Sequence, residues 1–145
     1  MMEKYVVPLV IVEEMGTVVG KTRLQKLTCI VEAKAREAQA FSTGLKFTLH
    51  LHGPFSRELS LLVDGWVREG VLEEKLNYTP SGHPQYSYYL SDKGTGSLRE
   101  LLKEVRDSEK YRALIRGVLK ESGWLPLPAL IERAYSAHAT IPETP

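Results

Sequence analysis

The sequence predicts a mainly helical α+β fold with a small antiparallel β wing. Three observations lead to this prediction: the apolar residues of several segments recur at helical spacing, one short segment alternates apolar and polar residues, and two strand-like runs flank a stretch rich in turn formers. At 145 residues, 43% hydrophobic and 26% charged, the chain has the size and composition of one globular domain with its own packed core.

Two helices are expected at the start of the chain. The first covers Lys4 to Met15, and Pro8 fits it only in the first turn, where the missing amide hydrogen of a proline is not needed. Gly16 ends this helix. The second runs from about Lys21 to Ala38, because apolar residues three and four positions apart form one stripe along it.

A strand and a third helix follow. From Leu45 to Leu51 apolar and polar residues alternate, which is typical of a half-buried strand, and Gly53-Pro54 ends the pattern. Ser56 is a favourable N-cap, and the apolar residues after it, Trp66 among them, have the spacing of an amphipathic helix that ends at Gly70.

A hairpin and three more helices complete the chain. Two short strands, Val71 to Leu76 and Gln85 to Leu90, flank a segment dense in turn formers, so we expect a hairpin with a long tip. Ser91 can cap a fourth helix, a fifth ends at Gly123, and the last covers Leu127 to Tyr135.

The order of these elements is typical of a winged helix-turn-helix with additional C-terminal helices. Three helices, with a strand before the third and a hairpin after it, form a compact unit in which the short strand can pair with the hairpin. We expect the winged helix-turn-helix core to cover residues 1–94 and a frayed tail to cover 139–145. Residues 95–138 form a helical extension that packs on the core or makes a dimer interface.

Four stretches carry a resemblance to the YwgA-like family. Residues 20–27, GKTRLQKL, resemble the opening of that family's second helix, and residues 52–59, HGPFSREL, are similar to its strand-to-helix turn. Residues 88–94 are similar to the wing-to-helix junction common in winged-helix proteins, and residues 130–135 resemble the family's terminal helix. The resemblance implies a winged-helix fold and a role in regulating transcription. A more distant similarity to Panacea-type antitoxins, in the first two stretches, implies a protein partner instead.

Composition and motifs favour a cytoplasmic protein without cofactor, metal or enzymatic activity. The only cysteine, Cys29, can form neither a disulfide nor a cysteine-based zinc site within one chain. The apolar run from Val6 to Val12 is too short for a membrane span and lacks a cleavage site. His50 and His52 lie on one side of a strand but have no third ligand, and no catalytic motif is recognisable.

The expected partner is double-stranded DNA, with the third helix in the major groove. Net charge is only +1, so binding must depend on a local basic face. The side chains expected to face the groove are Arg57, Ser60, Asp64 and Arg68. Those expected to contact the DNA backbone are Lys21, Arg23 and Lys26 on the second helix and Ser81 and His83 at the hairpin tip. A homodimer would double these contacts.

The alternative is a protein-interaction module of antitoxin or adaptor type. It is favoured by the near-neutral net charge and by the third helix, where three carboxylates outnumber Arg57 and Arg68. An exposed apolar patch that involves Leu61 and the last two helices would support a protein partner. A third interpretation is that the basic residues form only a solvated helix face.

Overall fold

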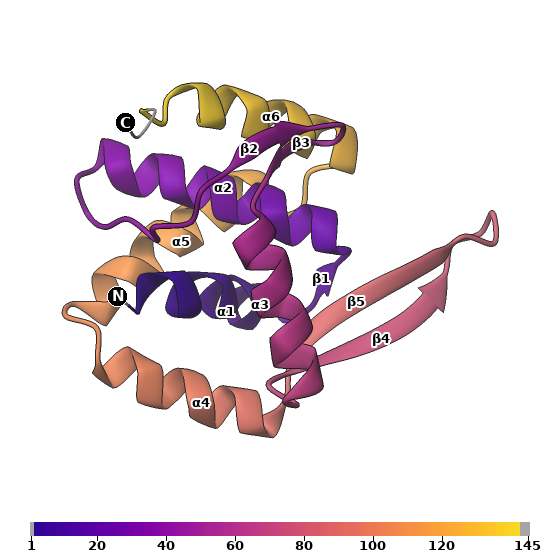
Figure 1. Cartoon of the computed structure of the whole chain (residues 1–145), viewed down its shortest axis with the longest axis horizontal. Coiled ribbons are helices and arrows are strands. Elements are labelled where there is room, and N and C mark those ends of the chain that lie inside the picture. The colour runs from indigo at the N-terminus through magenta and orange to yellow at the C-terminus, as the bar shows by residue number, and fades with distance from the viewer. Residues whose placement is uncertain (1, 143–145) are drawn as a thin grey trace.

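The computed structural model describes residues 2–142, which form six helices and two small antiparallel sheets (Figure 1). The predicted mainly helical α+β fold is therefore confirmed. In chain order the elements are α1 (Glu3–Met15), β1 (Val18–Val19), α2 (Lys21–Glu37), β2 (Thr48–His50), β3 (Gly53–Phe55), α3 (Arg57–Arg68), β4 (Leu72–Tyr78), β5 (Pro84–Leu90), α4 (Asp92–Lys103), α5 (Ser108–Ser122) and α6 (Leu127–Ala139).

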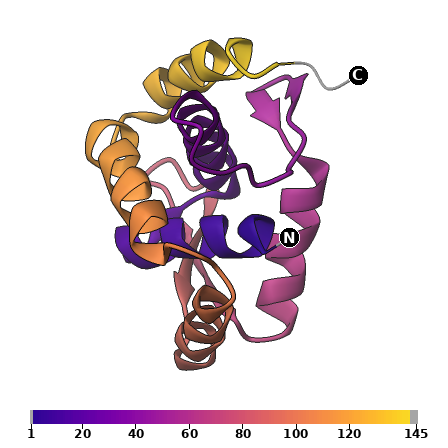
Figure 2. The ribbon, with the colours of Figure 1, turned by 90° about the vertical axis from the view of Figure 1, so that its left-hand side faces the viewer.

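Helix α1 lies at the centre of the core. All residues from Val6 to Val12 are buried, and α2, α4 and α5 pack around them, as Figure 2 shows. Pro8 is the sixth residue of this helix, so the expectation that it must lie in the first turn is wrong. A proline at that position removes one helical hydrogen bond at a cost of about 3 kcal/mol, and the burial of apolar side chains on every side of α1 outweighs this cost.

The long β4–β5 hairpin pairs with β1. Strand β5 is the middle strand of the sheet, with Val18 opposite Tyr88 on one side and Leu72 opposite Leu90 on the other. The expectation that residues 45–51 supply the partner strand is therefore wrong. Strand β1 has only two residues, which is too few for an alternating pattern to reveal it.

Only part of the predicted strand at residues 45–51 is a strand. Residues 48–50 form β2, which pairs with β3 in a separate hairpin. Leu45 and Phe47 are buried before it, whereas Leu49 and Leu51 are 60% and 89% exposed. The hairpin lies against α6, where the Tyr135 hydroxyl donates to the His50 carbonyl at 3.4 Å.

Two side chains of α2 hold the turn that precedes α3. The Gln25 amide accepts from the backbone N–H of Ser56 and donates to the carbonyl of the same residue, both at 2.8 Å. Lys26 Nζ donates to the Pro54 carbonyl at 2.8 Å. Ser56 caps α3 as predicted, since its Oγ accepts from the Leu59 N–H. Residues 20–27 and 52–59, two of the stretches that carry the YwgA-like resemblance, therefore fold against each other.

The C-terminal helices pack on α1 and α2 and share one apolar core with the rest of the chain. Leu98, Ile115 and Leu130, one from each of α4, α5 and α6, are fully buried in the cluster that contains the α1 side chains. The predicted boundary at residue 94 lies inside α4. Helix α6 continues to Ala139, so the predicted tail starts at its last residue, and residues 143–145 lie outside the described part.

Candidate macromolecule-binding surface

Helix α3 lies on one side of the molecule with its polar side uncovered. It crosses the front of the body in Figure 1 and forms one edge of the view in Figure 2, away from α5 and α6. Its main contacts are with α2 and β4. Leu59, Val63 and Trp66 face the core, as the amphipathic pattern predicts. We call the exposed and half-buried residues of the opposite side the α3 face: Arg57, Glu58, Ser60, Leu61, Asp64 and Arg68.

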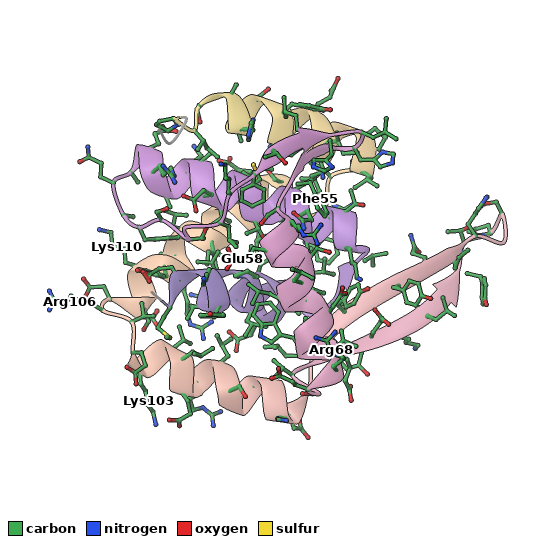
Figure 3. The ribbon with its side chains drawn as sticks, viewed as in Figure 1. Phe55, Glu58, Arg68, Lys103, Arg106 and Lys110 are labelled. Atoms are coloured by element: carbon green, nitrogen blue, oxygen red, sulfur yellow. The ribbon has the colours of Figure 1, made fainter. Side chains whose placement is uncertain are left out.

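Two carboxylates of the α3 face form ion pairs with lysines from other helices. Glu58 pairs with Lys4 of α1 at 2.8 Å, and Asp64 pairs with Lys21 of α2 at 2.6 Å. Within residues 2–142, the ion pairs do not include Arg57 or Arg68. Figure 3 shows Glu58 and Arg68 toward opposite ends of α3, with Arg68 near the base of the β4–β5 hairpin. The free positive charge of this face therefore comes from two arginines.

The three basic residues expected to contact DNA phosphates from α2 are all engaged within the protein. Lys21 is tied to Asp64, and Arg23 donates to the Gly123 carbonyl at 3.1 Å. Lys26 is only 2% exposed, and burial lowers its pKa. Its interpretation as a surface contact is wrong. Residues 24–33 of α2 are buried on every side of the helix. Apolar periodicity predicts burial on one side only, so it gives no sign that Lys26 is buried.

The tip of the β4–β5 hairpin is exposed and internally bonded. Ser81 Oγ lies 2.9 Å from His83 Nδ1 and 3.0 Å from Thr79 Oγ1, and the His83 N–H donates to Thr79 Oγ1. The hairpin projects well beyond the body in Figure 1, which places Ser81 and His83 far from the core. Both residues are accessible to a partner.

One side of this hairpin is apolar and exposed. Leu76 lies opposite Tyr86, and Tyr78 follows two positions later on the same side of β4. Closer to the core the same side carries Tyr88, which is buried and whose hydroxyl donates to Glu74 at 2.7 Å.

Within the described residues, the cysteine thiol is buried and the possible metal ligands do not cluster. Burial raises the pKa of the Cys29 thiol to about 12, so this thiol stays protonated at neutral pH. Among residues 2–142 no three histidine, cysteine or carboxylate side chains gather as a metal site would require. In the same part of the chain, no helix combines the length and the apolar character needed to cross a bilayer.

A comparison with known proteins finds a relative of unknown function. The chain is 27% identical over 111 residues to a protein of Bacillus subtilis (strain 168) whose name is "Uncharacterized protein YwgA". This similarity supports the predicted resemblance of the chain to a YwgA-like family. The aligned part covers 77% of this chain but only 63% of the YwgA protein, so the chain spans less than two thirds of that relative. No family model matches the chain.

Proposed function

We propose that the chain is a winged helix-turn-helix protein that binds double-stranded DNA as a transcriptional regulator. The supporting observation is an uncovered α3 followed directly by a projecting hairpin (Figure 1). In this proposal α3 is the helix that enters the major groove, β4–β5 is the wing and β1 is the short strand between the first two helices. The function depends on the α3 face and on the hairpin tip.

The roles of individual residues follow from their exposure and pairing. Arg57 and Arg68 would donate to base edges or phosphates, because their guanidinium groups have no carboxylate partner within residues 2–142. Ser81 and His83 would contact the backbone. Lys21 could reach a phosphate only by leaving Asp64. About two or three phosphate contacts per chain make a weak complex, so the proposal includes a homodimer that doubles them.

A salt series with random duplex DNA tests this function. We expect log affinity to fall linearly with log salt concentration. If Arg57 or Arg68 contacts a phosphate, its replacement by alanine should reduce the magnitude of this slope by about one. Arg99→Ala is the control, because Arg99 is exposed on α4, a helix that is not part of the α3 face. Affinity that no substitution changes, or that stays weaker than about 1 mM at low salt, would contradict DNA binding.

A protein partner is the second candidate, and a different observation favours it. The α3 face and the hairpin together expose Leu61, Leu76, Tyr78 and Tyr86, and Leu61 is 58% exposed. Counted on α3 alone, the two carboxylates of the α3 face match its two arginines, so this face has no net formal charge of its own. Exposed apolar and aromatic side chains next to a neutral polar surface are typical of protein interfaces.

Photo-crosslinking separates the two candidates. A photoreactive residue is placed at position 61 in the full chain, with a control at position 99. A protein partner predicts a saturable adduct at 61 only, and binding of the purified partner that Leu61→Ser weakens at least about tenfold. Leu61→Ser adds no charge, so affinity for random DNA should stay nearly unchanged. A DNA adduct alone would contradict the protein partner.

A further inference from the structure

A pocket of about 270 Å³ lies between the start of α2, the β2–β3 hairpin and α3. Ligand pockets for drug-sized molecules range from about 300 to 1,000 Å³, so this pocket has the size for a smaller molecule. It is adjacent to the α3 face, since Ser60 belongs to both. Figure 3 shows Phe55, another lining residue, at the junction of β3 and α3.

The ionisable side chains that line the pocket are all basic residues. They comprise Lys21, Lys26, His50 and His52, and none of the described lining residues is an aspartate or a glutamate. Lys21 has a counter-charge in Asp64, which lies outside the lining. The pocket therefore favours a ligand of negative charge.

Lys26 gives this preference its strongest physical basis. Its side chain is almost fully buried, yet its only hydrogen bond within residues 2–142 goes to the Pro54 carbonyl, and no carboxylate there lies within ion-pair distance. An ammonium group has three donors, and a buried charge without a counter-charge is unfavourable. An anion in the pocket would supply that counter-charge.

The first turn of α2 adds positive potential at the same place. Lys21 and Thr22 belong to that turn and line the pocket. Gly20, the N-cap, provides no side-chain hydrogen bond, and the turn contains no acidic residue. The N–H groups and the helix dipole at this end favour an anion.

The rest of the lining limits what the anion can be. Leu24, Phe55, Leu59 and Val63 form an apolar wall, and an inorganic ion would leave this wall without contacts. We propose that the pocket binds a small organic acid, in which a carboxylate is attached to an aromatic or aliphatic body. The carboxylate lies toward Lys26 and the start of α2, and the apolar body lies against Leu59 and Val63 of α3.

Such a ligand would contact the helix that carries the proposed macromolecule binding. The pocket is lined by three residues of α3, namely Leu59, Ser60 and Val63. A bound ligand would therefore contact α3 and stabilise it in one position. Ligand binding itself does not depend on the identity of the macromolecule. Failure of the DNA or protein assays would therefore leave the ligand experiment fully informative, and the reverse also holds.

Calorimetric titration of the full chain with matched acids and amides tests the pocket. The acids are benzoate, phenylacetate and hexanoate, and each is compared with its neutral amide and with inorganic phosphate. We expect at least one acid to bind about tenfold or more tightly than its amide and than phosphate. Backbone amide NMR shifts on adding that acid should concentrate in residues 20–26 and 59–63.

Two variants and one control complete the experiment. Lys26→Met should weaken acid binding at least about tenfold. Ser60→Phe, which fills the pocket from α3, should weaken it by a similar factor and provides the test if Lys26→Met does not fold. Lys34→Met is the control, since Lys34 is exposed on α2 outside this pocket. Equal affinity for acid and amide, unchanged affinity in a folded Lys26→Met or Ser60→Phe, or no binding at about 10 mM would each overturn the proposal.

Discussion

Gln25 shows how one side chain can fix the position of a whole helix. Its amide satisfies both backbone groups of Ser56, the buried residue that caps α3. Backbone groups buried without a partner destabilise a fold, so this pair of bonds determines where the turn can lie against α2. Every function proposed for the α3 face depends on that placement.

We predict that Gln25→Leu destabilises the protein by about 2 to 5 kcal/mol, because it leaves the N–H and the carbonyl of Ser56 buried and unpaired. Urea unfolding measures the change. Lys34→Leu, at an exposed position of the same helix, should change the free energy of unfolding by only about 0.5 kcal/mol. Equal effects of the two substitutions would show that the bonds to Ser56 contribute nothing.

Glu32 is a second buried polar group of α2, and it anchors the loop after that helix. Its carboxylate accepts from the Thr43 N–H at 2.7 Å, from Ser42 Oγ at 2.8 Å and from Arg36. Burial opposes ionisation, but the hydrogen bonds from Thr43, Arg36 and Ser42 outweigh it and lower the pKa of Glu32.

We predict that Glu32 makes stability depend on pH. A carboxyl group whose pKa is lower in the folded state than in the unfolded chain stabilises the fold fully above the unfolded value, about 4.3, and loses this effect as pH falls through the folded value. Urea unfolding between about pH 7 and pH 3 should therefore show a shallower decline for Glu32→Gln than for the wild type. Glu37→Gln, at an exposed position, should decline like the wild type.

The junction between the β4–β5 hairpin and α4 contains the Ser91 cap that the sequence predicts. Ser91 caps α4 by accepting from the Gly94 N–H, and its hydroxyl contacts the carbonyls of Gly70 and Val71. Gly94 lies so close to β4 that an added Cβ would be 2.0 Å from the Val71 carbonyl oxygen. The Ser91 to Gly94 stretch thus joins the start of α4 to the base of the hairpin.

We predict opposite effects for two glycine substitutions in α4. Gly94→Ala should destabilise the fold by about 1 to 3 kcal/mol or more, because the backbone of α4 or β4 must move. Gly96→Ala, where a Cβ meets no atom within 4 Å, should stabilise it by about 0.5 to 1 kcal/mol. Thermal unfolding of the two variants measures both, and a stabilised Gly94→Ala would contradict the close approach.

At the scale of the whole molecule, the C-terminal helices are part of the core. The α1 side chains from Val6 to Val12 are buried partly by α4 and α5, and α6 packs on α2 and β3. The first 94 residues therefore lack much of the apolar surface that covers their own central helix.

We predict that a fragment of residues 1–94 does not fold by itself, whereas the full chain unfolds in one cooperative transition. Circular dichroism during urea unfolding measures cooperativity, and dispersion of amide NMR signals reports whether the fragment is folded. A fragment with dispersed signals and a sharp transition of its own would contradict the single core.

The sequence by itself determined the elements whose signal is local. The third helix with its Ser56 cap, the hairpin after it and the Ser91 cap of α4 all follow from spacing, capping and turn residues, which act within a few neighbouring positions. The exposure of Arg57, Arg68, Ser81 and His83 also follows from such local patterns.

Only the tertiary structure decided which segments pair and which polar groups are buried. Strand β1, the partner of β5, is too short to leave a pattern, and the burial of Lys26 results from contacts with a turn 28 residues away. Hydrogen bonds and burial between distant segments depend on the complete packing of α1, α2 and the C-terminal helices, and that packing has no counterpart in local spacing. For the same physical reason, the pocket beside α3 exists only in the folded chain.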